Sequence, residues 1–277
     1  MTETRIPLAG VIGHPIAHSK SPRLHHHWLK RYGIRGHYIP MDVDPDDLKR
    51  VLSALPKAGF VGVNITVPHK VAALALSDRI TDRATLIGAA NTLTFRDDGS
   101  ILADNTDGVG FIENLRQGAP GWRADNGPIA VLGAGGAARA VLAALLEAGA
   151  EKIFLTNRTR PKAESLRSAF GSRIEVVDWV QAGNMIEEAS TVVNTTSLGM
   201  DGGPEFRVPL DGLRRGAVVT DLVYTPLKTP LLKAADEAGC ITVGGLGMLL
   251  HQAAPAFGRW FRVRPEVDVE LRAALLK

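Results

Sequence analysis

The feature that most constrains the fold of this chain is a strand, a glycine turn and a helix in immediate succession. The apolar run Ile129–Leu132 leads directly into Gly133-x-Gly135-x-x-Ala138, and apolar residues at helical spacing continue as far as Gly149. In this context the first glycine permits a tight turn, the second lets the backbone approach a pyrophosphate, and the helix N-terminus faces the negative charge. The pattern therefore predicts a Rossmann-type unit that binds a dinucleotide.

The residues at the end of the next expected strand indicate which dinucleotide. A site for NAD would place an acidic residue there to hold the ribose 2′-hydroxyl. This chain instead has Asn157-Arg158-Thr159-Arg160-Pro161-Lys162, which holds three cations and no acid. Guanidinium groups bind phosphate through two parallel hydrogen bonds, whereas helix starts without such a ligand disfavour cations. The segment favours NADP, whose ribose carries a 2′-phosphate.

Strand-like and helix-like segments alternate along the rest of the chain, which is typical of an α/β protein with parallel βαβ units. The 277 residues suffice for two domains, and the loop-like composition of residues 117–128 predicts a boundary. Helices are expected to open at Ser21-Pro22, with Ser21 as the N-cap, and at Asp44-Pro45. Residues 247–277 are expected to be helical and to pack on the first domain. Expected strands are 8–12, 37–42, 61–67, 91–95 and 101–103, of which the last two form a hairpin, then 129–132, 153–156, 175–177, 191–194 and 218–221.

Composition and charge exclude several classes of protein. The net charge is only +3, with no basic run interleaved with aromatic residues, so nucleic acid is not an expected partner. No stretch approaches the ~18 apolar residues of a membrane helix. The start of the chain, Met1 to Arg5 and the short run after it, is too interrupted for a signal peptide. Cys240 is the only cysteine, so an internal disulfide is impossible. We therefore expect a soluble, cytoplasmic protein that acts on a small molecule.

Two polar residues at the ends of apolar segments are candidates for proton chemistry. Lys70 follows Pro68 near a helix start, where a lysine opposes the helix dipole, and Asp107 follows the expected hairpin. Burial or a second cation would lower the pKa of the lysine, whereas a close Asp107 would raise it. If both side chains reach one pocket, they can move the proton of a hydroxyl during hydride transfer. The alternative is a surface salt bridge.

Two clusters near the N-terminus are also candidates for ligand binding. Ser19 and Ser21 offer hydroxyls to a carboxylate or a polyol, although N-capping alone explains Ser21. His25 to His27 suggest a metal, but consecutive helical residues point about 100° apart and cannot share one ion. No second His or Cys cluster has ligand spacing, so no metal site is expected.

Together these motifs resemble those of the shikimate dehydrogenase family, over essentially the whole chain. The matching segments, in the family's order, are His18 to Pro22, Asn64 to Lys70, Gly88 to Thr92, Asp104 to Gly108, Gly133 to Ala137, Asn157 to Thr159 and Gly245 to Met248. The resemblance implies an NADP-dependent oxidoreductase that interconverts 3-dehydroshikimate and shikimate in aromatic amino-acid (chorismate) biosynthesis. It also implies a two-domain α/β fold, with a substrate-binding domain at 1–107, a doubly wound NADP-binding Rossmann domain at 108–245, and C-terminal helices at 246–277 that return to the first domain.

The resemblance also implies roles for single residues. Lys70 and Asp107 match the family's catalytic pair. The positions that hold the substrate's carboxylate and hydroxyls are, besides these two, Ser19, Ser21, Thr66, Asn91, Tyr224 and Gln252. The cofactor positions are Asp82, Gly133, Ala134, Gly135, Gly136, Ala137, Asn157, Arg158, Thr159, Arg160, Lys162, Leu222 and Gly245.

Three functions are compatible with the sequence. The first is a shikimate dehydrogenase, the second is a relative that acts on quinate or an aminated analogue, and the third is a non-catalytic regulatory homologue that senses a ligand. Intact Lys70 and Asp107 argue against the third. Family members that accept NAD or quinate tend to carry an acid near Arg158 or a changed serine in the first loop, and this chain has neither. The active site is expected in the cleft between the domains of a monomer or a homodimer.

Overall fold

The computed structural model describes residues 6–276, so the expectation about Met1 to Arg5 lies outside the described residues. By contacts between residues the chain divides into two compact units. Unit 1 comprises the chain up to Thr106 together with the segment from Leu250 onwards, and unit 2 comprises Asp107–Leu249. The assignment of the substrate to the first unit and of the cofactor to the second stays a prediction.

Unit 1 is built on a mixed sheet with the strand order β2-β1-β3-β5-β6-β4. β1 (Leu8–Gly13) pairs in parallel with β2 (His37–Asp42) and with β3 (Phe60–Ile65), as expected of strands joined by helices. β5 (Thr92–Phe95) is antiparallel to β3 and to β6 (Ile101–Asp104), which confirms the predicted hairpin. The edge strand β4 (Arg79–Ile80) was not predicted, because two residues carry no periodicity.

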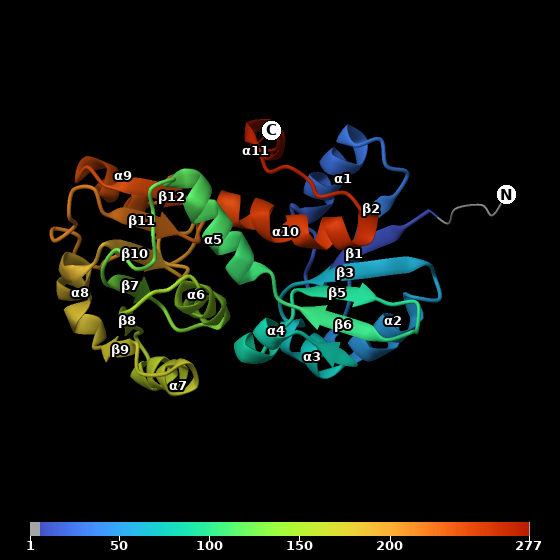
Figure 1. Ribbon diagram of the computed structural model, residues 1–277, viewed down its shortest axis with the longest axis horizontal. Helices are drawn as coiled ribbons and strands as arrows, with labels where there is room; N and C mark the ends of the chain where they lie inside the picture. The colour runs from blue at the N-terminus through green and yellow to red at the C-terminus, as the bar shows by residue number, and fades with distance from the viewer. Residues whose placement is uncertain (1–5, 277) are drawn as a thin grey trace. The chain divides into compact units, whose positions relative to one another are not determined.

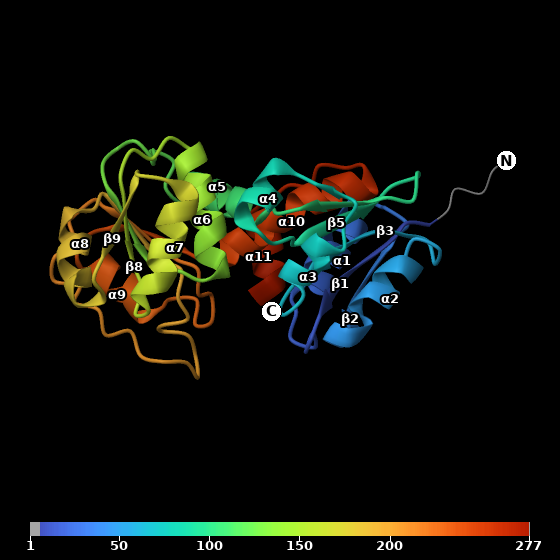
Figure 2. The ribbon, with the colours of Figure 1, turned by 90° about the horizontal axis from the view of Figure 1, so that it is seen from below.

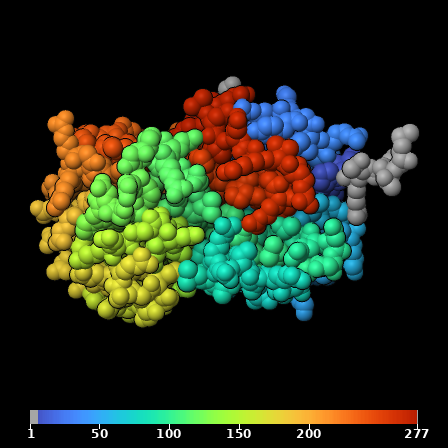
Figure 3. All heavy atoms as spheres, viewed as in Figure 1, coloured from blue at the N-terminus to red at the C-terminus, as the bar shows by residue number. Residues whose placement is uncertain are grey.

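Two apolar cores cover the two faces of this sheet. The helices of unit 1 are α1 (Ser21–Arg31), α2 (Leu48–Ala54) after a 3-10 turn at Pro45–Asp47, α3 (Lys70–Ala75), α4 (Asp82–Ile87), most of α10 (Leu246–Phe261) and α11 (Val269–Leu276). Trp28 of α1 packs on Phe257 of α10 with ring centroids 5.2 Å apart, and its Nε1–H donates to the carbonyl of Glu266 at 2.9 Å. The C-terminal segment, red in Figure 3, thus lies against the blue N-terminal segment, which confirms the expected packing of the tail.

His25 lies at the centre of the aromatic core between α1 and α10. It is fully buried and stacks on Tyr38 with ring centroids 3.8 Å apart. Burial, followed by the charge of His26, lowers the pKa of its imidazole to about 3, so this histidine is neutral at physiological pH. Among residues 6–276, no three His, Cys, Asp or Glu side chains gather in a way that could hold a metal ion.

Unit 2 is a parallel sheet with the strand order β12-β11-β10-β7-β8-β9, which is the order of two wound βαβαβ halves. The strands are β7 (Ile129–Leu132), β8 (Ile153–Thr156), β9 (Ile174–Val177), β10 (Thr191–Asn194), β11 (Val218–Asp221) and β12 (Ile241–Gly244). The five strands expected here are confirmed. β12 was not predicted; it is an edge strand whose first residue, Ile241, is 46% exposed.

Helices cover both faces of this second sheet. They are α5 (Asp107–Gly118), α6 (Gly136–Glu147), α7 (Arg160–Phe170), α8 (Ala182–Glu188) after a 3-10 turn at Trp179–Gln181, and α9 (Pro230–Glu237). Ile129 and Val131 of β7 share a core with α5, α6 and α7, whereas Ala130 and Leu132 share a core with α8 and α9. This alternation makes unit 2 doubly wound (Figure 1). In Figure 2, β8 and β9 lie between α8 on one side and α6 and α7 on the other.

Candidate active site

The predicted substrate residues of unit 1 gather at one edge of its sheet. β1 and β3 are parallel, so Ser19 and Thr66, which follow them, emerge at the same edge. β5 is antiparallel to β3, so Asn91, the residue before β5, lies at that edge too. β6 runs back beside β5 and places Asp104 opposite the start of β5. The topology therefore brings together side chains that the sequence separates by more than 80 residues.

Asn91 is the centre of a buried polar network. Its Nδ2 donates to Thr106 Oγ1 at 3.0 Å and to Gln252 Oε1 at 3.1 Å, and its Oδ1 accepts from the backbone N–H of Thr106 at 2.9 Å. Thr106 Oγ1 also donates to the carbonyl of Gln252 at 2.8 Å. Two predicted substrate residues, Asn91 and Gln252, are thus in direct contact. Thr106, which joins them, lies in the matching segment Asp104 to Gly108 but is not among the predicted site residues.

Lys70 is the first residue of α3, as the sequence indicates. Its side chain is half-buried, and its carbonyl accepts from Ala90 N at 2.9 Å, beside Asn91. The preceding His69 is buried, with Nε2 at 2.8 Å from the carbonyl of Val43, so this histidine anchors the start of the helix. Asp107 is the first residue of α5 and opens unit 2. Its pairing with Lys70 stays a prediction.

The loop after β1 differs from the expectation at Ser21. Ser21 was expected to be the N-cap of α1, but Lys20 is the N-cap and Ser21 is the first helical residue. Ser19 is placed for the capping instead, because its Oγ accepts from Ser21 N at 3.3 Å. Ser21 itself is buried and bonds to the hydroxyl of Tyr38, which donates to Asn64 Oδ1 at 2.8 Å.

Asp104 is a charged residue of this edge that sequence reasoning missed. Its buried carboxylate accepts from Arg83 Nε at 2.6 Å, from Thr81 Oγ1 at 2.8 Å, and from Arg259. Burial raises the pKa of this carboxyl, but the bonds from Arg83 and the charge of Arg259 outweigh it and hold the pKa well below its usual range. The carboxylate therefore fixes the chain just before Asn105 and Thr106. Asp82, in the first turn of α4, is exposed, and its cofactor role stays a prediction.

The glycine turn of unit 2 has the predicted form. Gly133 has φ +106° and links β7 to the Gly135 N-cap of α6. The end of β8 lies beside this turn, since Gly133 N donates to the carbonyl of Thr156 at 2.8 Å and Ala134 N donates to Asn157 Oδ1 at 3.2 Å. Gly136 and Ala137 open the helix itself. The structure thus joins the glycine turn and the start of the cationic segment, both predicted cofactor residues.

The three cations after β8 differ in their partners. Arg160 is bound to acids: its Nη1 lies 2.5 Å from Asp178 Oδ1 and its Nη2 lies 2.9 Å from Glu164 Oε1. Arg158 and Lys162 are exposed and have no acidic partner among residues 6–276. Thr159 is the N-cap of α7. Sequence alone does not distinguish Arg160 from the other two cations, because Asp178, which directly follows β9, is near in space and distant in sequence. A role of Arg160 in cofactor binding stays a prediction.

Leu222 and Tyr224 line a pocket of about 360 Å³ at the carboxyl ends of β10 and β11, together with Thr195, Thr196, Ser197, Met200, Val223 and Thr225. A Cβ at Gly245 would collide with the carbonyl oxygen of Leu222, so two more predicted cofactor residues are in contact. In doubly wound sheets this edge is where ligands bind.

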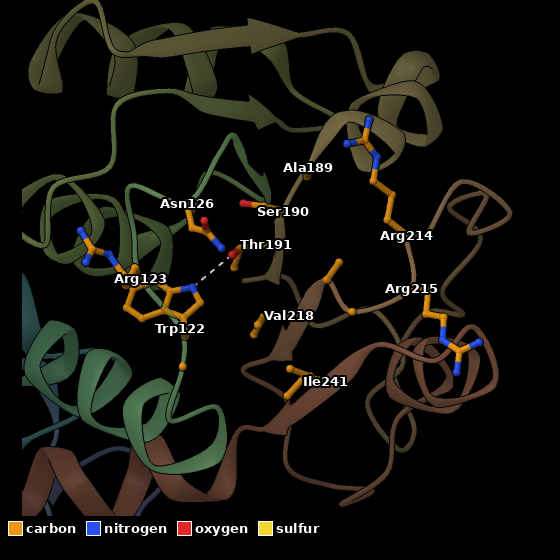
Figure 4. Close-up of a pocket in the computed structure, with 13 residues that line it drawn as sticks. Trp122, Arg123, Asn126, Ala189, Ser190, Thr191, Arg214, Arg215, Val218 and Ile241 are labelled. Carbon is orange, nitrogen blue, oxygen red and sulfur yellow. Dashed lines mark hydrogen bonds between the residues drawn. The ribbon is translucent and has the colours of Figure 1, made fainter.

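A second pocket of unit 2, of about 340 Å³, lies at the opposite edge of the sheet, where β10, β11 and β12 begin. Figure 4 shows Trp122 donating to Thr191, with the guanidinium groups of Arg214 and Arg215 pointing away from the indole. None of the predicted site residues lines it.

Within residues 6–276, no helix has the length and apolar character to cross a membrane.

Comparisons with known proteins identify the family to which this chain belongs. Residues 11–93 match the family described as shikimate dehydrogenase substrate binding domain, and residues 121–199 match shikimate / quinate 5-dehydrogenase. A relative from Cereibacter sphaeroides (strain ATCC 17029 / ATH 2.4.9), named shikimate dehydrogenase (NADP(+)), is 68% identical over 100% of this chain and 99% of its own length. The chain belongs to the shikimate dehydrogenase family. The predicted resemblance is confirmed.

Solved structures of family members share the fold. A shikimate 5-dehydrogenase from Thermus thermophilus, in complex with NADP(H) and shikimate, has a TM-score of 0.86 and 37% identity, covering 98% of both chains. A quinate dehydrogenase from Corynebacterium glutamicum, in complex with NAD, has a TM-score of 0.91 and 32% identity, covering 98% of this chain and 99% of its own. Structures with this fold thus include one with NADP(H) and shikimate bound and one with NAD bound.

Proposed function

We propose that this protein is an NADP-dependent shikimate dehydrogenase, which interconverts 3-dehydroshikimate and shikimate in aromatic amino-acid biosynthesis. The identity of 68%, over the full chain, to a relative named for this activity carries the proposal. Quinate is the second candidate substrate, because the quinate dehydrogenase from Corynebacterium glutamicum has the same fold. Identity to that enzyme is 32%, less than half as high. The intact Lys70 and Asp107 argue against a regulatory homologue.

The turn after β7 fits NADP. A Cβ at Gly135 or Gly136 would meet no atom within 4 Å, so open space lies over the N-terminus of the 12-residue helix α6. Backbone N–H groups at such a helix start favour a pyrophosphate. Arg158 and Lys162, which have no acidic partner in the described chain, are placed to bind the 2′-phosphate, whereas Arg160 is already paired with acids. When bound, NADP supplies or accepts the hydride.

The chain's own residues would bind the substrate and move its proton. Thr106 holds the amide of Asn91 and the backbone carbonyl of Gln252, and the Asn91 amide in turn holds the side chain of Gln252. Both amides are thus preorganised for the substrate's hydroxyls, and Ser19, Ser21 and Thr66 lie at the same edge of the sheet. As the carbinol C–H bond gives up its hydride, the hydroxyl O–H bond breaks and its proton passes to the pair formed by Lys70 Nζ and the Asp107 carboxylate. In the reverse direction this pair returns the proton to the carbonyl oxygen.

Initial rates with each combination of NADP or NAD and shikimate or quinate test the proposal. We expect the highest kcat/KM with NADP and shikimate. No turnover with any combination would refute an enzymatic function, and a higher kcat/KM with quinate would make the second candidate the correct one.

The choice of nucleotide has its own test in a matched pair of variants. Arg158→Ala should raise the KM for NADP at least tenfold and leave that for NAD unchanged, because only the 2′-phosphate distinguishes the two. Arg160→Ala should change the KM for NADP less than threefold, because this guanidinium is bound to Asp178 and Glu164. The reverse order of the two effects would contradict the assignment.

We also propose that the protein acts in the cytoplasm, as a monomer or a homodimer. Its single cysteine, Cys240, supports a reducing compartment. Light scattering after size-exclusion chromatography distinguishes the two assembly states, and cell fractionation tests the location.

A further inference from the structure

Two buried polar residues stand side by side at the ends of neighbouring strands in unit 2. Asn194 and Asp221 are the last residues of β10 and β11, occupy the same register of the parallel pair, and are both fully buried. Asn194 Nδ2 donates to Asp221 Oδ1 at 2.9 Å. Beyond these two residues the chain leaves the sheet, so each side chain lies at the base of one loop.

Asn194 holds the loop that follows β10. Its Oδ1 accepts from the backbone N–H of Thr196 at 3.0 Å and from Thr196 Oγ1 at 2.7 Å. Its Nδ2 also lies 3.3 Å from the carbonyl of Leu198, which accepts from it. One amide thus bonds to both ends of the segment 196–198, so this short loop can hardly move without breaking several buried hydrogen bonds.

Asp221 holds the loop that follows β11. Its Oδ1 accepts from Val223 N at 3.0 Å, and its Oδ2 accepts from Thr229 Oγ1 at 2.7 Å. Thr229 is in turn the N-cap of α9 and accepts from Leu232 N at 3.3 Å. No cation is among these partners, so the fold keeps a buried carboxylate at a cost in free energy. In some proteins such a group is retained because it fixes one specific geometry.

The two loops fixed in this way form one wall of the dinucleotide site. Together they supply the lining of the 360 Å³ pocket described above. They also touch the glycine turn, because a Cβ at Gly133 would lie 2.6 Å from Thr195 Oγ1. In the proposed function, the glycine turn binds the pyrophosphate, and Arg158 and Lys162 bind the 2′-phosphate. A dinucleotide that lies across the strand-order reversal between β7 and β10 then places its other end on β10 and β11.

We propose that Asn194 and Asp221 are positioning residues, which hold the two loops against the nicotinamide end of NADP without touching the cofactor. This inference rests on the proposed function. The geometry of the nicotinamide half of the site then depends on a buried amide–carboxylate pair and not on the loop sequences alone.

The test compares two probes that share one end. NADP reaches both halves of the site, whereas 2′,5′-adenosine bisphosphate lacks the nicotinamide and reaches only the glycine turn and the cations. With Asp221→Ala we expect the Kd of NADP to rise at least tenfold and the Kd of the bisphosphate to stay within twofold. The KM for NADP should rise with it. Equal weakening of both probes, or of neither, would overturn the proposal.

Three variants separate positioning from general stability. Val219→Ala, two residues earlier on β11, removes a fully buried apolar side chain and should lower the melting temperature while leaving both Kd values within twofold. Asp221→Asn should restore NADP binding to within threefold of wild type, because its Oδ1 still accepts from Asn194 and its Nδ2 can donate to Thr229. If Asp221→Ala does not fold, Thr229→Val removes one of the same bonds and should weaken NADP binding threefold to tenfold. A Val219→Ala effect equal to that of Asp221→Ala would refute the role.

The two proposals fail in distinguishable ways. If wild type binds NADP but turns over neither shikimate nor quinate, the proposed function is wrong while the binding comparison still decides the role of Asp221. If wild type is active and Asp221→Ala binds NADP as wild type does, only the positioning role is wrong.

Discussion

Replacing Gly133 by alanine tests whether the glycine turn is required by its backbone angle or by the space around it. Gly133 has φ +106°, and an added Cβ would lie 2.6 Å from Thr195 Oγ1 and 2.8 Å from Thr196 Cγ2. Gly149 is a matched control, because its φ is +100° but its Cβ would meet nothing within 4 Å. The two substitutions therefore share the backbone strain and differ in the steric contact.

The magnitudes follow from these two contributions. A left-handed backbone costs an alanine about 1–2 kcal/mol, partly offset by the reduced entropy of the unfolded chain, so Gly149→Ala should lose about 1 kcal/mol of unfolding free energy. Gly133→Ala must also displace the loop after β10, and overpacking of this kind adds about 1–3 kcal/mol. We expect a total loss of about 2–4 kcal/mol at Gly133.

Urea unfolding followed by far-ultraviolet circular dichroism measures both losses, and titration with NADP measures the functional consequence. Thr195 Oγ1 donates to the carbonyl of Leu132 at 2.8 Å, so its displacement also disturbs the end of β7 beneath the cofactor. Gly133→Ala should weaken NADP binding at least tenfold, and Gly149→Ala should leave it unchanged. Equal stability losses in the two variants would show that the contact with Thr195 is unimportant and would refute the reasoning.

Four further outcomes are expected. Lys70→Ala should lower turnover by roughly 10²–10⁴ while the exposed control Lys49→Ala has no effect; near-normal rates would make Lys70 structural. Asp104→Asn should lose about 3 kcal/mol of unfolding free energy in urea, because two arginines lose their buried partner, and a loss below about 1 kcal/mol would contradict the ion cluster. Burial raises the pKa of Asp221 to about 6, so the ionised carboxylate lowers the unfolding free energy fully above pH 6 and not at all below pH 4. Asp221→Asn should therefore raise the unfolding free energy by up to about 3 kcal/mol at pH 8 and leave it unchanged at pH 4. An increase that does not depend on pH would exclude this cause. His25, with its lowered pKa, stays neutral in the folded protein, whereas its imidazole in the unfolded chain takes up a proton as the pH falls. Between pH 8 and pH 5.5 the unfolding free energy of wild type should therefore fall by about 1 kcal/mol relative to that of His25→Phe. Parallel plots of unfolding free energy against pH would disprove this.

Much of the fold follows from local patterns. Gly133 and the strand before it identify unit 2, since the turn, the apolar run and the helix are contiguous and each constrains the next. The same holds for the hairpin around Asp97-Asp98-Gly99-Ser100 and for the position of Lys70 at a helix start. The strand β4 escaped prediction because its two residues are too few to show a period.

The partners of the site residues could not be predicted in the same way. Asn91 contacts Gln252 across 161 positions and Asp104 contacts Arg259 across 155, and no local pattern encodes such pairs. Arg160 looks like a phosphate ligand in sequence, but Asp178 neutralises it from the end of the next strand. Asn194 and Asp221 resemble ordinary strand ends until the sheet order makes them neighbours.

The division of the chain also has a consequence for its synthesis on the ribosome. Unit 2 is complete once Leu249 has emerged, but unit 1 needs the segment from Leu250 onwards to finish its core. Until α10 arrives, Trp28 and Leu24 lack the side chains that bury them. At about 5–20 residues per second, the roughly 140 intervening residues keep that apolar surface uncovered for about 7–30 s. The α1 face of unit 1, although made first, is therefore the last part of this unit to be covered, and it is the part of the nascent chain that a chaperone would bind.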